Sequence, residues 1–409
     1  MRPLDYERVY SALANYAIGI DAFEIISVPD LSRPLKHTVE ALRGGLMPAQ
    51  YRWTEEKTRR AYSYKDYGEW TRSIIVAAKN YFTDEEYPDK GGYIHSSSAA
   101  ASSPDRSGLW EPSTDNTKRP YGRIARFTWR NNYHYLTERL QEMIGGLERE
   151  LDISIRVRAL SNYTSIPEKV LFAYSGLAAF GKNCVLMNKT MGSYFVVGEV
   201  LTDLPVDFTD RQFQPTGTPG MPDFSMCGNC TLCIDACPTG ALFGKGSIDV
   251  NRCFQYLSEN LVPVPHAYRS KWGNRLYGCS TCIDVCPYNS ELEPSAEKHT
   301  IGYVGTGDDL INLLSYSEKQ WQQRFMHNQL IIRDRLAIIK NALLCLGNYP
   351  SMGALQTLLV FLSHSSPTIR SFAAWALGKL GSTEGRKALE RRLEEEKDIS
   401  VLHEIGRLL

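Results

Sequence analysis

The chain has 409 residues, which is long enough for two or three domains with full hydrophobic cores. Its 46 lysine and arginine residues balance 46 aspartate and glutamate residues, so local patches would have to hold any nucleic-acid partner. The N-terminus lacks the apolar core of a signal peptide, and no run of eighteen apolar residues occurs. We therefore expect a soluble protein of a reducing cytoplasm, in which thiols stay reduced.

The first two hundred residues alternate between predicted helices and strands. Apolar residues at helical spacing predict a helix from residue 5 to about 20, and short apolar runs predict strands at 23–28 and 73–78. Further along, the same patterns predict a helix at 133–150, a strand from 153 to 161, a helix at 168–177 and a strand at 194–201. This alternation predicts an α/β or α+β layer up to about residue 205, and the proline- and glycine-rich segment 215–222 predicts a linker after it.

Eight of the ten cysteines lie in the sixty-one residues from Cys227 to Pro287. The first four have the C-x2-C-x2-C-x3-C-P spacing of bacterial ferredoxins, in which the fourth thiolate binds the other cluster of a pair. This crossed pattern predicts two 4Fe-4S clusters with the ligand sets Cys227, Cys230, Cys233 and Cys286, and Cys253, Cys279, Cys282 and Cys237. Structural zinc is the alternative, but zinc ribbons use two separated cysteine pairs and not one contiguous run.

The C-terminal part is predicted to be helical from about Asp308 onwards. The sequence Asn341-Ala-Leu-Leu-Cys-Leu-Gly347 recurs thirty-one residues later as Phe372-Ala-Ala-Trp-Ala-Leu-Gly378, and two related helical units predict a short HEAT-type α-solenoid. Basic residues near this repeat form either ordinary solvated helix faces or a local phosphate-binding stripe. They are Arg333, Arg335, Lys340, Arg370, Lys379, Arg386, Lys387, Arg391 and Arg392.

An ordered set of motifs resembles the epoxyqueuosine reductase family over about residues 70 to 400. These motifs are Gly122-Arg-Ile-Ala-Arg-Phe with Tyr133-His134, Gly176-Leu-Ala-Ala-Phe-Gly-Lys-Asn183, Gly192-Ser193 with Gly198-Glu-Val-Leu-Thr-Asp-Leu-Pro205, the cysteine motif, Gly273-Asn-Arg-Leu-Tyr-Gly-Cys279, and the helical repeat. The resemblance implies an α+β fold of three domains. They are a reductive-dehalogenase-like cobalamin-binding α/β domain (1–214), a bacterial-ferredoxin-like two-cluster domain (215–300) and a HEAT-like α-solenoid (301–409).

Members of that family deoxygenate epoxyqueuosine in a tRNA anticodon loop to give queuosine, using a base-off cobalamin that the two clusters reduce. The resemblance therefore implies an oxidoreductase that binds a tRNA anticodon stem-loop and takes electrons from an external donor such as flavodoxin or ferredoxin. We expect a monomer without a membrane association. By matching motifs, the residues implied to line the cobalamin are Ala125, Asn162, Asn183, Cys184, Gly192, Ser193 and Ser280.

The chain departs from the family at the residue that protonates the substrate. The family has an aspartate there, and counting back from Gly181-Lys-Asn183 puts Asn162 at that position. An amide forms hydrogen bonds but does not deliver a proton near neutral pH. Either Tyr163, Glu168 or water replaces the acid, or the chain is a paralogue. Such a paralogue would reduce a small organohalide or epoxide, or would carry cobalamin or electrons without catalysis.

Overall fold

The structure, a computed structural model, describes residues 2–48, 54–63, 68–85, 120–162, 166–209 and 224–409. The chain forms two compact units, each built from three separate segments. Unit 1 comprises Met1–Asp84, Asn131–Asn251 and Cys282–Ile301, and unit 2 comprises Glu85–Arg130, Arg252–Thr281 and Gly302–Leu409. The domain boundaries 1–214, 215–300 and 301–409 stay a prediction, and the expected linker lies outside the described residues.

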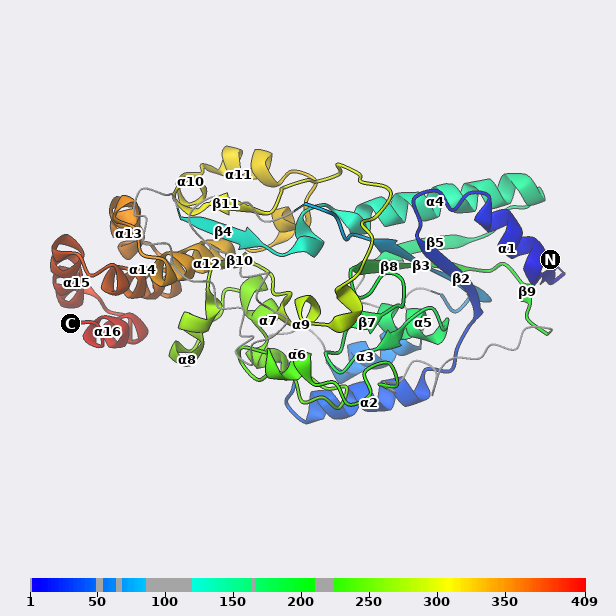
Figure 1. Cartoon of the computed structure of the whole chain (residues 1–409), viewed down its shortest axis with the longest axis horizontal. Helices are drawn as coiled ribbons and strands as arrows, with labels where there is room; N and C mark the ends of the chain where they lie inside the picture. Colours follow the sequence, from blue (N-terminus) through cyan, green and yellow to red (C-terminus); the bar gives the residue numbers. More distant parts are fainter. Residues whose placement is uncertain (1, 49–53, 64–67, 86–119, 163–165, 210–223) are drawn as a thin grey trace. The chain divides into compact units, whose positions relative to one another are not determined.

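A four-stranded antiparallel sheet forms the centre of unit 1 (Figure 1). Its strand order is β2 (Ala22–Ser27), β3 (Ser73–Asn80), β8 (Phe195–Thr202) and β5 (Val157–Ser161). Every residue of β3 is buried, including the polar Ser73, Lys79 and Asn80 at its ends, and its centre is the apolar run that the sequence predicts as a buried strand. Mixed helices and strands in this unit confirm the predicted α+β class.

Both faces of this sheet are covered by helices. The helix α4 (Asn132–Leu151) contacts β8, and its buried residues include Leu136 and Leu140. Behind the opposite face, α5 (Glu168–Tyr174) contributes Leu171 and Phe172 to a hydrophobic cluster. The remaining elements of unit 1 are β1 (Leu4–Asp5), α1 (Tyr6–Ala14), α2 (Ser32–Arg43), α3 (Glu55–Tyr62), β6 (Ala179–Phe180), β7 (Leu186–Met187), β9 (Val206–Asp207), α6 (Leu232–Asp235) and η4 (Pro287–Asn289).

The strand predicted from residue 153 begins later than the alternation suggests. Pairing with β8 starts at Val157, which lies opposite Thr202, and Thr202 is the last residue of β8. Residues before Val157 therefore have no partner strand in this sheet, although their apolar and polar residues alternate. The end of β5 at Ser161 agrees with the prediction.

Unit 2 combines a small sheet with a run of helices. Its strand β4 (Tyr121–Ile124) lies between β10 (Arg275–Tyr277) and β11 (Gly307–Asp309). The helices that follow in this unit are α7 (Phe254–Glu259), α8 (His266–Arg269), α10 (Leu310–Ser315), α11 (Glu318–Phe325), α12 (Arg335–Asn348), α13 (Leu355–Leu362), α14 (Pro367–Leu380), α15 (Thr383–Glu395) and α16 (Ile399–Gly406). The short helix α9 (Thr281–Asp284) begins in unit 2 and continues into unit 1.

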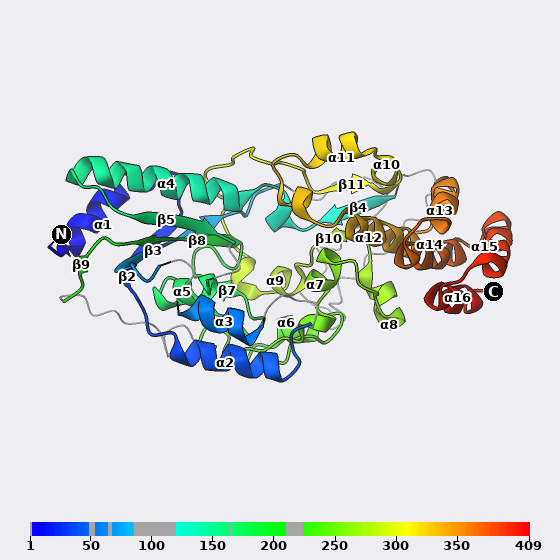
Figure 2. The same cartoon turned by 180° about the vertical axis from the view of Figure 1, so that it is seen from behind.

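The two copies of the sequence repeat lie on neighbouring helices. Asn341 to Gly347 belongs to α12 and Phe372 to Gly378 to α14, and these two helices pack against each other (Figure 2). The close approach requires Gly347, since a Cβ there would collide with the Trp375 ring. This arrangement explains why both copies carry small residues between their large apolar ones.

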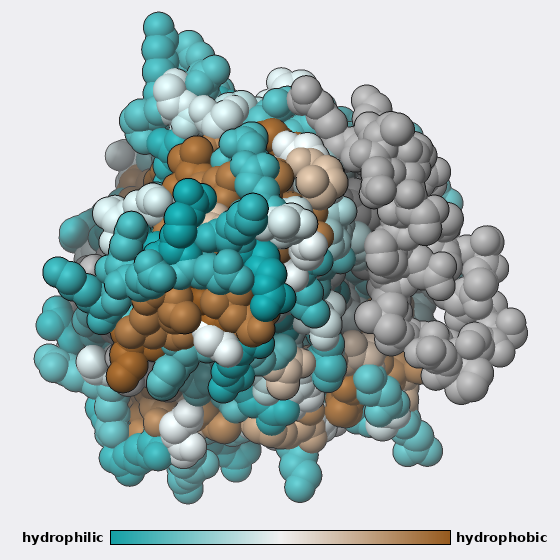
Figure 3. All heavy atoms as spheres, turned by 90° about the vertical axis from the view of Figure 1, so that its left-hand side faces the viewer, coloured by the Kyte–Doolittle hydropathy of each residue, from teal (hydrophilic) through white to brown (hydrophobic). Residues whose placement is uncertain are grey.

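The face that carries the C-terminal helices is largely hydrophilic, with hydrophobic patches between the polar groups (Figure 3). Exposed apolar side chains of these helices include Val360 of α13 and Ile399 of α16. Within the ranges described above, no helix combines the length and apolar character that crossing a bilayer requires.

Candidate metal centre

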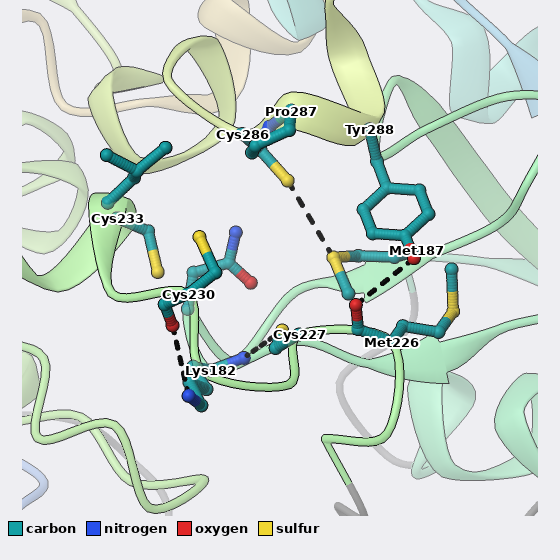
Figure 4. Close-up of a pocket in the computed structure, with 11 residues that line it drawn as sticks. Lys182, Met187, Met226, Cys227, Cys230, Cys233, Cys286, Pro287 and Tyr288 are labelled. Carbon is teal, nitrogen blue, oxygen red and sulfur yellow. Dashed lines mark hydrogen bonds between the residues drawn. The ribbon is translucent and has the colours of Figure 1, made fainter.

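Four thiols of unit 1 line one pocket, and they are the first ligand set that the sequence predicts. Cys227 and Cys230 lie in the loop before α6, Cys233 lies within α6, and Cys286 directly precedes η4. Figure 4 shows their side chains around a common space. The other lining residues are Lys182, Asn183, Met187, Met226, Leu232, Pro287 and Tyr288.

Local turns bring the first three thiols to this pocket. The Cys230 amide donates to the carbonyl oxygen of Cys227 (2.9 Å), and the Ile234 amide donates to that of Thr231 (2.8 Å). Gly228, between the first two cysteines, has a positive φ of 47°, a conformation that glycine adopts without strain. The spacing of the motif therefore produces a tight turn followed at once by a single helical turn.

The four thiols disfavour one another's charged form. Burial raises the pKa of the Cys233 thiol to about 11, and the nearby Cys227, Cys286 and Cys230 thiolates add to the rise. Burial is also the main cause of the raised pKa of Cys286. Iron bound among these sulfurs would offset the burial and the repulsion, because a coordinated thiol is deprotonated by the metal charge. The pocket thus fits a thiolate-bound cation.

The second predicted ligand set is divided between the two units. Cys237 and Cys282 belong to unit 1, whereas Cys253 and Cys279 belong to unit 2. In unit 1, the Ala241 amide donates to Cys237 Sγ (3.3 Å). In unit 2, the Cys279 amide donates to Gln255 Oε1 of α7 (2.9 Å), and Cys253 directly precedes that helix.

The described cysteines are not arranged around a single metal ion. Among the residues that the structure describes, no three histidine, cysteine, aspartate or glutamate side chains form a group that could hold one metal ion. What the four thiols of the first set share is one pocket. Both ligand assignments stay predictions.

The turn of the β6–β7 hairpin contributes Lys182 and Asn183 to the lining of this pocket. Asn183 donates from Nδ2 to the carbonyl oxygen of Cys282 (3.3 Å), and its Oδ1 accepts from the Val185 amide (3.1 Å). The preceding Lys182 donates from Nζ to the carbonyl oxygens of Gly228 (2.7 Å) and Cys230 (3.0 Å). The sequence singled out Asn183 in the Gly-Lys-Asn motif but gave Lys182 no role.

Gly192 and Ser193, which are also implied to line cobalamin, lie against the segment that follows Cys286. The Ser193 amide donates to Asn289 Oδ1 (2.7 Å), and Gly192 has a positive φ of 56°. Ser193 is 2% exposed, and its hydroxyl has no hydrogen-bond partner among the described residues. Such an unpaired buried hydroxyl is costly and indicates a missing partner. The hydroxyl thus fits a bound polar group.

The remaining cobalamin candidates are distributed over both units. Cys184 is half-buried with a positive φ of 61°, and burial raises its pKa to about 11. Ala125 and Ser280 are buried and belong to unit 2. The assignment of these residues to a corrin stays a prediction.

Of the predicted catalytic residues, Asn162 lies at the carboxyl end of β5. Asn162 follows that strand directly, is exposed, and has a positive φ of 57°. Glu168 is the first residue of α5 and is half-buried. Tyr163 lies outside the described residues.

A second carboxyl that the sequence did not single out lies on the neighbouring strand. Glu199 of β8 is 0% exposed, and neither carboxylate oxygen has a hydrogen-bond partner within the described part of the chain. Its burial, and secondarily the charge of Glu168, raises its pKa well above the ordinary value. The motif that begins at Gly198 contains Glu199, but the apolar and polar pattern of this strand does not show that Glu199 faces the buried side of the sheet.

For two of the basic residues near the repeat, both alternatives, a solvated helix face and a phosphate-binding stripe, are wrong, because their side chains are buried and paired within the protein. Lys340 is 0% exposed and donates to the carbonyl oxygens of Leu257 (2.5 Å) and Asn260 (2.7 Å), while burial lowers its pKa to about 7. Arg370 forms two hydrogen bonds of 2.7 Å with buried Glu396. The basic residues that stay exposed are Lys379, Arg386, Lys387 and Arg391.

Comparisons with known proteins agree with this arrangement. Residues 226–289 match the family model of the 4Fe-4S double cluster binding domain, and residues 333–409 match that of HEAT repeats. The epoxyqueuosine reductase of Bacillus cereus is 33% identical over 296 residues, which cover 70% of this chain and 73% of that protein.

Two solved structures extend the similarity to almost the whole chain. One is epoxyqueuosine reductase with a tRNA-Tyr epoxyqueuosine-modified stem loop, with a TM-score of 0.78, 26% identity, and coverage of 99% of this chain and 98% of that one. The other is the Bacillus subtilis enzyme with its aspartate-bearing catalytic loop swung out of the active site, with a TM-score of 0.75, 27% identity and 99% coverage of both chains. The chain belongs to the epoxyqueuosine reductase family.

Proposed function

We propose that this protein reduces epoxyqueuosine in tRNA to queuosine, with two 4Fe-4S clusters and cobalamin as cofactors. The observation that carries the proposal is the similarity, over 99% of the chain, to an epoxyqueuosine reductase bound to its modified stem loop. The match of residues 226–289 to double-cluster domains supports the two clusters. We place the reaction in the cytoplasm, with the tRNA anticodon stem-loop as partner and the protein as a monomer.

The clusters supply electrons one at a time. Removing an epoxide oxygen as water consumes two electrons and two protons, so an external one-electron donor such as flavodoxin or ferredoxin must act twice per turnover. We assign the first cluster to Cys227, Cys230, Cys233 and Cys286, whose thiols share one pocket. The second is assigned to Cys253, Cys279, Cys282 and Cys237. A structural zinc site predicts zinc without iron in the purified chain, which elemental analysis measures directly.

The cobalamin assignment is supported by one buried side chain with an unused hydrogen-bonding group. Ser193 has a buried hydroxyl without a partner among the described residues, and the adjacent Gly192 and the turn at Asn183 and Cys184 belong to the same unit. When bound, cobalamin supplies a strongly reducing cobalt centre. Ser193 would donate a hydrogen bond to it, whereas Asn183 already uses both its amide groups within the protein.

Proton delivery distinguishes this chain from its family. The carboxamide of Asn162 is not an acid, so the protons must come from Glu168, Tyr163 or water. Glu168 lies at the start of the helix that follows Asn162 in the chain, and its side chain is near enough to the buried Glu199 for its charge to act on that carboxyl. We assign Glu168 the role of proton donor.

Asn162 also favours a second candidate function. A paralogue without the acid would reduce a small organohalide or another epoxide, or would bind cobalamin and transfer electrons without catalysis. The small-molecule reductase predicts turnover that does not depend on tRNA. The carrier predicts tight cofactor binding without turnover of any added acceptor.

The test is nucleoside mass spectrometry of tRNA from a strain that lacks its own reductase. We expect the wild-type chain to replace epoxyqueuosine by queuosine, and Cys286→Ser to leave epoxyqueuosine in place. Epoxyqueuosine that persists with the wild-type chain contradicts the proposal. If the Asn162→Asp chain then removes it, the natural protein has lost the acid and serves another role.

A further inference from the structure

Lys182 contacts the loop of the first cysteine set at three points. It lies in the turn of the β6–β7 hairpin, and its amide donates to Cys227 Sγ (3.4 Å). Its Nζ donates to the carbonyl oxygens of Gly228 (2.7 Å) and Cys230 (3.0 Å), as Figure 4 shows for Cys230. Neither the cysteine spacing nor the family resemblance gives this side chain a role.

These contacts hold a positive charge against the loop that carries two of the four thiols. Lys182 is half-buried and lines the same pocket as Cys227 and Cys230. Water and salt screen such a charge less than one on the open surface. The lysine therefore differs from Lys189, which is exposed shortly after the same hairpin.

The charge has a direct consequence for a cluster in this pocket. A 4Fe-4S cluster that takes up one electron gains one negative charge, and the surrounding charge is among the factors that set its potential. A fixed cation beside the ligand loop stabilises the reduced form more than the oxidised form. The direction of the effect follows from the sign of the charge alone.

We propose that Lys182 raises the reduction potential of the cluster bound by Cys227, Cys230, Cys233 and Cys286, an inference that rests on the proposed assignment of that cluster. Lys182 is a positioning residue, because it acts through the ligand loop and not on the substrate. The hydrogen bond to Cys227 Sγ comes from the main-chain amide of Lys182, so a side-chain substitution leaves that hydrogen bond in place. The contribution of the ammonium group can therefore be measured separately.

The test is an anaerobic redox titration of the reconstituted full chain, with titanium(III) citrate as the one-electron reductant and electron paramagnetic resonance as the readout. Lys182→Met and Lys182→Gln remove the charge, Lys182→Arg keeps it, and Lys189→Met is the matched surface control. We expect one of the two cluster potentials to shift to lower values in the two neutral variants while the other stays unchanged. The arginine variant and the surface control should match the wild type.

Several results would overturn the inference. Unchanged potentials in both neutral variants show that the charge does not act on the cluster. Loss of one cluster from both the Met and the Gln variant also overturns it, because the side chain is then needed to hold the ligand loop and does not only adjust the potential of a bound cluster. A wild-type chain that takes up no iron and sulfide removes the basis of both proposals, and iron analysis identifies that case before any potential is measured.

Discussion

Glu199 provides the sharpest test of how the sheet of unit 1 is stabilised. It lies opposite Val76 of β3 and Leu160 of β5, and both of these neighbours belong to the hydrophobic cluster under the sheet. A carboxyl in such surroundings loses its hydration in the charged form, so burial raises its pKa well above the ordinary value of 4.5, with the charge of Glu168 as a smaller cause. The folded protein therefore binds a proton at Glu199 that the unfolded chain releases.

The sign of the effect on stability follows from this difference in proton binding. Below pH 4.5 the carboxyl is protonated in both states and costs nothing further. Between 4.5 and the raised pKa, the unfolded chain gains from ionisation and the folded chain does not, so the free energy of unfolding falls by about 1.4 kcal/mol for each pH unit. Stability is thus lost as pH rises, and the loss ends at the raised pKa.

The perturbation is Glu199→Gln, which keeps the size of the side chain and removes its ionisation. We expect the free energy of unfolding of the variant, relative to wild type, to increase by about 1.4 kcal/mol per pH unit above the ordinary pKa. Urea titrations of both proteins at a series of pH values measure this slope. The difference between matched variants is used because a chain with two units need not unfold in one step.

A second buried carboxyl on the same sheet serves as the comparison. Glu24 of β2 accepts a hydrogen bond from Tyr6 Oη (2.5 Å), and burial raises its pKa to about 7. Glu24→Gln should show the same sign, with a difference that stops growing at about pH 7. A difference between Glu199→Gln and wild type that does not change with pH would refute the reasoning, because it would mean that Glu199 is ionised in the folded protein.

Three further substitutions test the metal centre and the helical packing. Cys286→Ser should lower the iron content to about half of the wild-type value, and complete loss of iron would contradict two separate ligand sets. Asn341→Leu leaves two main-chain carbonyl oxygens without their donor and should lower the free energy of unfolding by about 2 kcal/mol or more in urea titrations. Gly192→Ala places a Cβ against Asn289 Oδ1 at a positive φ, so we expect a lower melting temperature, and an unchanged one would show that the loop adapts.

The elements that could be predicted from sequence are those whose signal is local. β3 and β8 consist mostly of apolar residues, and the first cysteine motif fixes four cysteines and a proline within the twelve positions from Cys227 to Pro238. The start of β5 could not be predicted, because strand pairing depends on where β8 ends at Thr202 and not on the alternation before Val157. Alternating apolar and polar residues indicate which side chains face the core, but a β-strand also needs a neighbouring strand with which to form hydrogen bonds.

The contacts around the site depend on residues far apart in the chain, which a single sequence does not reveal. Lys182 meets Cys227 forty-five positions later. The sequence leaves Lys340 either on a solvated helix face or in a phosphate-binding stripe, but α12 is buried on nearly every side, so its ammonium group donates to carbonyl oxygens of unit 2. A charged residue within an apolar helix thus indicated an internal partner and not a solvated face.

Asn162 raises the question of whether the residue is retained for its chemistry or for its backbone. It has a positive φ of 57°, and the left-handed conformation costs most residues about 1–2 kcal/mol, while glycine, asparagine and aspartate adopt it more readily. Asparagine thus suits this position even if its amide never meets a substrate. Aspartate suits it as well, so the Asn162→Asp test of the proposed function does not depend on a change in folding.

Two more substitutions separate the chemical and conformational roles of Asn162. Asn162→Gly removes the side chain and keeps the conformation, whereas Asn162→Ala removes the side chain and strains the backbone. If the amide contacts the substrate, the glycine variant should convert less epoxyqueuosine in tRNA at an unchanged melting temperature, and the alanine variant should lose both conversion and stability. Equal conversion by the glycine variant and the wild type would show that Asn162 serves only the turn after β5, and would remove it from the cofactor site.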